Sequence, residues 1–318
     1  MTNPFVFLVG CPRSGTTLLH RLVDAHPDVA IVHETLWIPK YYERRIGLTA
    51  EGNVTPELSA RLLEHRRFGQ LGIEPAELER LLAAYADSSY AEFVTALFDN
   101  YGARRGKLLA GDKSPGYVRS IPVLHALWPR AKFVHLIRDG RDVCLSAVNW
   151  KKADSLFRDH GTWPQEPIAT AALWWERSVR LGREASAALP AGLYLEVRYE
   201  DLVADPEVEC QRICSFLALG FDEAMLRFHE GRTRTTPGLT TKRKWLPPVA
   251  GLRDWRTEMS SDEIGRFEAA AGELLDELGY ERGARDLDSE LAANATALRS
   301  RFIGDVSTRG RPLPERWA

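Results

Sequence analysis

Short apolar runs rich in β-branched and aromatic residues recur along the chain, and stretches with helical spacing separate them. The first run ends at Gly10, and a run that is apolar on both faces is typical of a central parallel strand. The strands predicted from this pattern are Phe5–Val9, Val29–His33, Leu108–Ala110, Phe133–Ile137 and Leu193–Val197. Because helical patterns lie between the strands, the sequence predicts βαβ units. The expected structure is an α/β fold of three layers, with a central parallel sheet of about five strands flanked by helices.

Three longer segments are also predicted from their hydrophobic spacing. Residues 37–106 contain only helix-like patterns, which predict a helical insertion beside the sheet. Residues 231–258 are rich in Arg, Lys, Thr and Pro with little periodicity, so a long loop is expected there. In the tail, residues 281–318, the apolar positions around Leu291, Leu298 and Phe302 would form one face of a helix. That face would pack either on the rest of the chain or on a second copy, which would make a homodimer.

Composition limits the classes of protein that fit this pattern. The chain has 318 residues, of which 44% are hydrophobic and 27% charged, as in an ordinary globular protein. Because the predicted elements run through one sheet, we expect a single domain over residues 1–318. The formal net charge of −2 argues against nucleic acid as a partner, although it leaves room for a local basic pocket. The sequence shows neither a signal peptide nor an apolar run of membrane-spanning length, so a cytoplasmic protein is expected.

The strongest local signal is the segment Gly10–Thr17, which reads GCPRSGTT and lies between a predicted strand and a predicted helix. Backbone N–H groups of such a turn, together with the N-terminus of the helix, bind phosphate groups. The spacing matches the ATP-binding loop except that Thr16 stands where that loop has lysine. The loop therefore indicates a P-loop-type fold. It leaves open a nucleotide kinase or NTPase with a degenerate Walker A motif, or a non-catalytic nucleotide-binding protein.

At Pro12–Thr17 the chain resembles the sulfotransferases that use 3′-phosphoadenosine-5′-phosphosulfate (PAPS). The run from Pro12 to Pro39 is especially similar to the tyrosylprotein-sulfotransferase branch and its bacterial relatives. The resemblance extends over roughly residues 4–280. It implies that the loop binds the 5′-phosphosulfate of the nucleotide through Arg13, Ser14, Gly15, Thr16 and Thr17.

A second anion site is expected at the end of the strand Phe133–Ile137. Arg138 follows this strand directly and Ser146 lies eight residues further on, which resembles the family's binding motif for the nucleotide's 3′-phosphate. Asp139 and Asp142 are predicted to cap the next helix and to interact with its dipole. Arg141 would either pair with these carboxylates or touch the ligand.

Three further positions match the family's nucleotide site less specifically. Tyr199 follows the last predicted strand, and its alternative role is that of an ordinary core tyrosine. Thr241 and Lys242 belong to the basic part of the predicted long loop, for which a solvated loop is the alternative.

The general base is expected at the end of the second strand, where ligands of parallel sheets bind. Glu34 directly precedes Thr35 and lies 21 residues after Arg13, as the catalytic glutamate of the tyrosylprotein branch does. His33 is the alternative, because the small-molecule branch uses histidine. Lys113 resembles a lysine that stabilises the transferring group. Asp112 could be read instead as a magnesium ligand, although the loop lacks the lysine of an NTPase.

These residues together predict a PAPS-dependent sulfotransferase that releases adenosine 3′,5′-bisphosphate (PAP) and needs no metal. Glu34 would deprotonate the acceptor, and Arg13 and Lys113 would stabilise charge as the sulfuryl group moves. A small-molecule, glycan or lipid hydroxyl is expected as acceptor, in preference to a protein tyrosine, and the insertion at 37–106 would shape its pocket.

Overall fold

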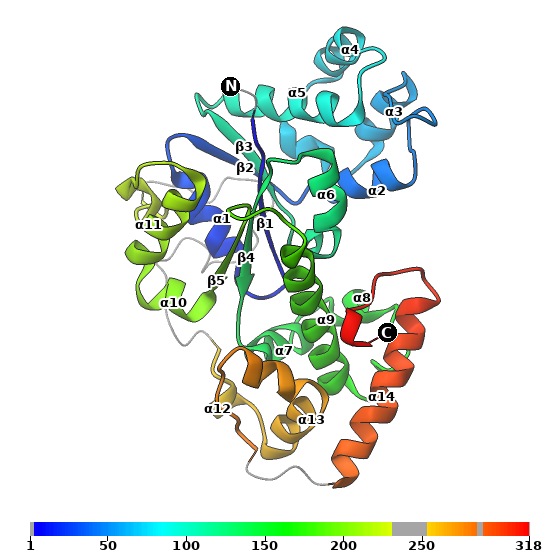
Figure 1. Ribbon diagram of the computed structural model, residues 1–318, viewed down its shortest axis with the longest axis vertical. Coiled ribbons are helices and arrows are strands. Elements are labelled where there is room, and N and C mark those ends of the chain that lie inside the picture. The colour runs from blue at the N-terminus through cyan, green and yellow to red at the C-terminus, as the bar shows by residue number, and fades with distance from the viewer. Residues whose placement is uncertain (1–2, 231–252, 285–288, 318) are drawn as a thin grey trace.

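A computed structural model of the chain describes residues 3–230, 253–284 and 289–317. Its centre is a five-stranded, all-parallel sheet in the order β2-β3-β1-β4-β5 (Figure 1). The strands are β1 (Val6–Gly10), β2 (Val29–His33), β3 (Leu109–Lys113), β4 (Lys132–Ile137) and β5 (Tyr194–Arg198). The predicted parallel α/β sheet is confirmed. β3 runs three residues beyond its prediction because polar residues at its end do not show the apolar pattern of a strand.

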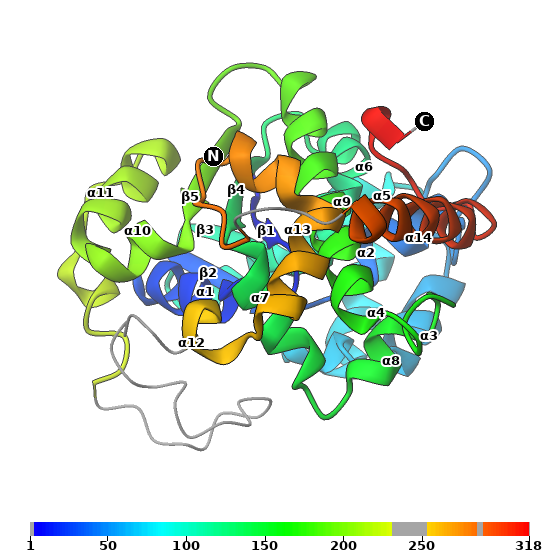
Figure 2. The same ribbon diagram turned by 90° about the horizontal axis from the view of Figure 1, so that it is seen from below.

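Helices cover both faces of the sheet and make the three layers (Figures 1 and 2). On one face, α1 (Thr16–Ala25), α10 (Tyr199–Ala204) and α11 (Pro206–Leu217) pack over the strands. On the other face lie the 3₁₀ helix η2 (Pro115–Ser120), α6 (Ile121–Leu127) and the long α9 (Pro167–Ala187). β1 is buried along its whole length because it lies in the middle of these layers.

The segment 37–106 forms the upper part of the molecule in Figure 1. Its elements are α2 (Ile38–Glu43), α3 (Glu57–Glu64), η1 (Phe68–Leu71), α4 (Pro75–Ala84) and α5 (Tyr90–Ala103). The prediction of helices alone was incomplete, since isolated antiparallel bridges join Leu48 to Val54 and Asn53 to Ser89. A shared apolar core joins these helices to the sheet, which gives the segment a fixed place beside the strands.

The short helix η3 (Glu223–Met225) packs on α1. Below the sheet in Figure 1 lie further helices that follow β4 in sequence. They are α7 (Gly140–Val148), α8 (Ala153–Phe157), α12 (Trp255–Glu258), α13 (Ser261–Glu277), α14 (Ser289–Ser307) and η4 (Glu315–Trp317). The short helix α12 corrects the prediction of an uninterrupted loop over 231–258, because Asp254 caps its first turn. α14 packs on α9 and α13 and buries Leu298 and Phe302 there, so the predicted tail helix is docked on the chain itself.

The four cysteines are buried and free. In the described part of the chain, no helix combines the length and the apolar composition that a membrane span requires.

Candidate active site

The carboxyl ends of the parallel strands bring the predicted site residues to one edge of the sheet. β1 leads into the loop 11–15, β2 into Glu34, and β4 into Arg138, while Lys113 ends β3. In open α/β sheets, ligands bind at this edge. The topology therefore gathers residues that are far apart in sequence.

The loop after β1 has the backbone of an anion-binding turn. Arg13 and Gly15 have φ angles of 78° and 94°, in the left-handed region. Gly15 is the N-cap of α1 and offers no side-chain cap, so the N–H groups of Thr16 and Thr17 remain available to a ligand. The buried Ser14 hydroxyl has no hydrogen-bond partner among the described residues. Such a set of unsatisfied donors is suited to phosphate or sulfate oxygens.

Tyr199 connects the loop to the second predicted anion site. A Cβ atom on Gly15 would lie 2.4 Å from its ring, so only glycine fits there. The guanidinium of Arg138 lies over the same ring, 4.3 Å from its centroid. Tyr199 is therefore a buried aromatic that also separates and positions the two basic regions.

Replacing Gly15 by Ala should destabilise the fold by more than the left-handed backbone alone would cost. The added methyl group would displace the Tyr199 ring and, with it, Arg138. Gly72→Ala is a matched control, because Gly72 also has a positive φ, 62°, but has open space around its Cβ position. In urea unfolding, the free energy of unfolding should fall by about 1–2 kcal/mol in the control, the ordinary cost of a side chain in the left-handed region. It should fall by more in Gly15→Ala. Equal losses would contradict the role given to Tyr199.

Arg13 and Ser146 contact each other directly. The Arg13 Nε donates to Ser146 Oγ at 3.2 Å, and its guanidinium lies 5.1 Å from the ring centroid of Trp150. Sequence reasoning instead grouped Ser146 with Arg138. It missed Trp150 altogether, since a single tryptophan after a helix carries no motif. The structure thus connects the phosphate loop to the far end of α7.

Arg138 is buried and holds two neighbours. It donates to Asp142 at 3.0 Å and stacks on Tyr199, while its Nε has no partner within the described residues. The predicted cap is confirmed, because Asp139 accepts from the backbone N–H of Arg141. Arg141 is fully buried against Asp139 and Glu268, so of its two predicted roles the structure supports the ion pair.

Glu34, Lys113 and His33 form a contact cluster at the adjoining strand ends. The Lys113 ammonium donates to Glu34 Oε1 at 2.8 Å and lies 3.1 Å from His33 Nε2. Lys113 is 1% exposed, whereas the Glu34 side chain is 24% exposed. Glu34 has a φ of 60°, a strained value for a residue with a side chain, and such strain is typical of functional sites.

Arg67 is the member of this cluster that sequence reasoning missed. It precedes η1 in the segment 37–106, and its Nη2 lies 3.0 Å from Glu34 Oε2. Both oxygens of Glu34 are therefore paired with a cation. Arg67 is the last of three consecutive basic residues, His65 to Arg67, and nothing in this run of sequence indicates a contact with Glu34.

The charges in the cluster separate the two candidate bases. Burial above all, and then the positive charge of Lys113, lower the pKa of His33 to about 3, so this histidine is neutral. Burial raises the pKa of Glu34, but Lys113 above all, then His33 and last Arg67 outweigh it, and the net pKa lies below the ordinary value. Burial lowers the pKa of Lys113 against the pull of Glu34. Glu34 is thus an ionised carboxylate at the surface of the cluster.

Asp112 has a structural place beneath the cluster. It is fully buried, and Oδ2 accepts from the backbone N–H of Thr35 at 3.0 Å. Burial raises its pKa to about 6 from an ordinary 3.8. This contact ties β3 to the turn after β2, which differs from the solvent-facing position of a magnesium ligand.

The raised pKa of Asp112 predicts a pH dependence of stability. Between about pH 4 and 6 the folded protein keeps this proton while the unfolded chain has lost it, so stability falls as pH rises through that window. Asp112→Asn keeps an acceptor for Thr35 and removes the titration. The free energy of unfolding of the wild type relative to this variant should therefore decrease from pH 4 to 6, by at most about 1.4 kcal/mol per pH unit. A constant difference across the window would contradict it.

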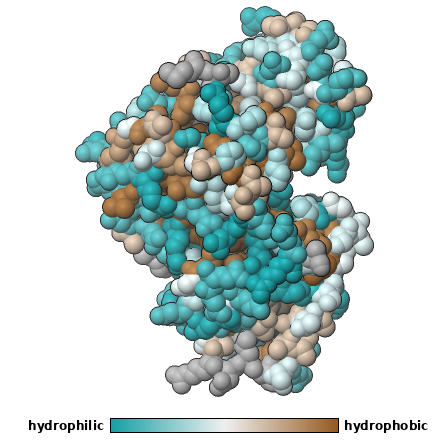
Figure 3. Space-filling view, in the orientation of Figure 1, coloured by the Kyte–Doolittle hydropathy of each residue, from teal (hydrophilic) through white to brown (hydrophobic). Residues whose placement is uncertain are grey.

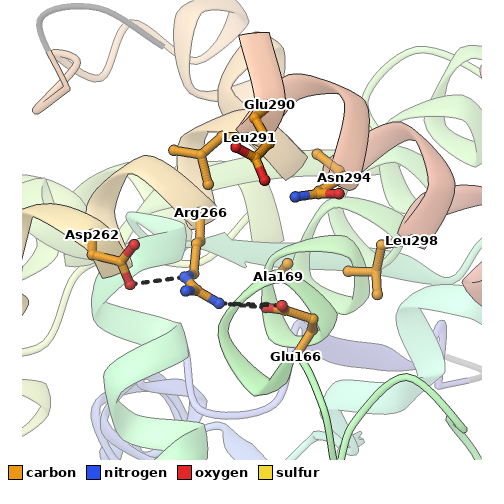
Figure 4. Close-up of a pocket in the computed structure, with 9 residues that line it drawn as sticks. Glu166, Ala169, Asp262, Arg266, Glu290, Leu291, Asn294 and Leu298 are labelled. Carbon is orange, nitrogen blue, oxygen red and sulfur yellow. Dashed lines mark hydrogen bonds and ion pairs between the residues drawn. The ribbon is translucent and has the colours of Figure 1, made fainter. Parts of the chain in front are cut away.

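A hollow of about 310 Å³ between α9, α13 and α14 lies outside this cluster (Figure 4). Arg266 extends across it and pairs with Glu166 and Asp262. With Glu290 also on its wall, the hollow is unfavourable for phosphate groups. Thr241 and Lys242, the other two predicted nucleotide contacts, lie outside the described residues.

The comparisons with known proteins agree with this geometry. The pattern of the "Sulfotransferase family" matches residues 4–223. The chain belongs to this family. The sulfotransferase is 26% identical over 289 residues to protein-tyrosine sulfotransferase A of Caenorhabditis elegans, which covers 89% of this chain and 69% of the relative. It is also 26% identical over 330 residues to the omega-hydroxy-beta-dihydromenaquinone-9 sulfotransferase Stf3 of Mycobacterium bovis, covering 89% and 76%.

One solved structure shows the same fold. The sulfotransferase domain from the curacin biosynthetic pathway aligns with 98% of this sulfotransferase and 99% of its own chain, with a TM-score of 0.54 and 21% identity. Family and fold together establish an enzyme of the sulfotransferase type. This result decides against the two alternatives that the loop left open, a nucleotide kinase or NTPase and a non-catalytic nucleotide-binding protein.

Proposed function

We propose that this sulfotransferase transfers the sulfuryl group of PAPS to an acceptor hydroxyl, with Glu34 as general base. The observation that carries the proposal is the ionised Glu34 carboxylate, held by Lys113 at the same sheet edge as a phosphate loop with an unpartnered Ser14 hydroxyl. When bound, PAPS would supply the activated sulfuryl group. The residues of the chain would do the rest by positioning and electrostatics.

The proposed roles follow from where each side chain lies. The donors of Arg13, Ser14, Gly15, Thr16 and Thr17 would hold the phosphosulfate end of the nucleotide at the N-terminus of α1. Arg138 has an unpartnered Nε within the described structure and would bind the 3′-phosphate, together with Ser146 and the ring of Tyr199. Thr241 and Lys242 would complete the nucleotide site.

In the transfer step, Glu34 would take the proton of the acceptor hydroxyl while a bond forms between that oxygen and sulfur. The bond from sulfur to the phosphate oxygen breaks, and PAP leaves with the electron pair. Arg13 and Lys113 would stabilise the charge that develops on the transferring group and on the leaving phosphate.

The acceptor would enter beside the segment 37–106. In the orientation of Figure 1, the surface is indented between the part that carries α2 and α6 and the part that carries α8 (Figure 3). We propose a small-molecule, glycan or lipid hydroxyl as acceptor, in keeping with the menaquinone named for the mycobacterial relative. We further propose that residues 1–318 act as a single sulfotransferase domain.

Titration calorimetry with PAP and with ATP tests the donor. We expect PAP to bind tightly and ATP to bind weakly or not at all, and the reverse order would contradict the proposal. Radiolabelled PAPS supplied with phenols, glycans and lipid alcohols then identifies the acceptor class by the labelled product.

A further inference from the structure

Arg67 reaches the proposed base from a different part of the fold. Arg67 directly precedes η1 and Glu34 directly follows β2, and their side chains form an ion pair of 3.0 Å. The Arg67 side chain is 23% exposed, so both partners lie at the mouth of the cluster and Lys113 lies beneath them. The contact joins the catalytic edge of the sheet to the helical segment 37–106.

The two ion pairs of Glu34 have different geometric consequences. An ionised carboxylate has about four acceptor positions, and Lys113 and Arg67 use one on each oxygen. Lys113 alone would leave the carboxylate free to turn about that one contact. The second contact, on Oε2, fixes the plane of the group and leaves its remaining acceptor positions pointed outward.

The two cations also differ in what else they serve. The charged and titratable groups that face Glu34 among the described residues are Lys113, His33, Arg67 and Arg13. Under the proposed function, Lys113 and Arg13 share their charge with the phosphosulfate. His33 is neutral. Arg67 is then the cation that continues to hold Glu34 during turnover.

We propose that Arg67 is a positioning residue for the general base. It holds Oε2 of Glu34 so that the carboxylate stays ionised and aimed at the acceptor hydroxyl. It also makes the orientation of the base depend on the segment proposed to line the acceptor pocket. The inference rests on the proposed function, since it assigns Arg67 to the same reaction.

Three variants test this role by steady-state sulfuryl transfer from PAPS, measured against pH. Arg67→Gln should lower kcat by about 10- to 100-fold, because a misaligned base loses its near-attack geometry. Removing the cation also raises the pKa of Glu34, so the acidic limb of kcat/KM should move to higher pH. Arg67→Lys should restore part of both changes. Arg66→Gln, which removes the same charge from the exposed neighbour, should leave both parameters at wild-type values.

The KM for PAPS separates positioning from donor binding. It should stay within about twofold of wild type in Arg67→Gln, because the contact is with the base. An unchanged kcat and pH profile would overturn the proposal. So would a large rise in the KM for PAPS, since Arg67 would then belong to the donor site.

A second measurement keeps this inference distinct from the proposed function. The pH titration of the Glu34 carboxyl carbon can be followed by ¹³C NMR in the protein mixed with PAP. The spectrum of Glu34→Gln assigns the signal. An upward shift of its pKa in Arg67→Gln but not in Arg66→Gln supports the contact, and no shift overturns it. If the wild type transfers no sulfuryl group to any acceptor, the proposed function fails, and this titration still decides the inference.

Discussion

Replacing Glu34 by Gln should lower kcat by about 10²- to 10⁴-fold, the usual contribution of a general base. Glutamine has the shape of glutamate and tolerates the same backbone, but its amide does not accept a proton at neutral pH. Only one of its two terminal groups can accept from Lys113 or Arg67, so part of the local network is lost as well. Steady-state sulfuryl transfer from PAPS measures the effect.

PAP affinity is the control for this variant. It should remain within a few-fold of wild type, because Glu34 follows β2 and its ion pairs are with Lys113 and Arg67 and not with the loop after β1. His33→Gln is the matched comparison for the choice of base. It should cost less than Glu34→Gln, since His33 has a pKa near 3 and is bonded to Lys113. If the order of the two effects is reversed, the base is His33.

Lys113→Met should lower kcat by about 10²- to 10³-fold, comparable to removing one donor that stabilises developing charge. Methionine fills the same buried space, and Lys113 is almost wholly enclosed, so the loss reports mainly the missing ammonium. The pKa values of Glu34 and His33 should both rise, because the Lys113 charge lowers each of them. Kinetics measures the first effect, and imidazole NMR measures the second on His33.

Two observations would contradict this account of Lys113. A kcat close to wild type would mean that the ammonium serves only to neutralise Glu34 in the empty enzyme. A loss of PAP binding equal to the loss of kcat would place Lys113 in the nucleotide site. Thermal unfolding of the variant shows whether the strand β3, which ends at Lys113, has kept its pairing.

Local patterns were sufficient for much of the fold. β2 was predicted with its observed bounds, and β1 and β4 within one residue at each end, because buried parallel strands are nearly continuous apolar runs. The edge strand β5, which is half-buried over most of its length, was also predicted within one residue at each end. The docked tail helix was predicted only as one of two alternatives. An apolar helical face requires a partner, but its periodicity does not say which surface supplies it.

The site was predictable where its residues follow strands. Arg13, Glu34, Lys113 and Arg138 all lie at strand ends, and the parallel topology alone brings such positions to one edge. Their placement at one edge of the sheet therefore needed no knowledge of side-chain packing. The roles given to them in catalysis and nucleotide binding remain proposals that the variants above test.

The sequence by itself determined the α/β class, the phosphate loop and the acidic and basic residues at the strand ends, because each of these is encoded in neighbouring positions. Only the tertiary structure decided that Ser146 contacts Arg13, that Tyr199 packs on Gly15, and that Arg67 pairs with Glu34. The physical reason is that such contacts depend on how separate elements pack. No short stretch of sequence records the distance between two side chains that meet only after the helices have packed on the sheet.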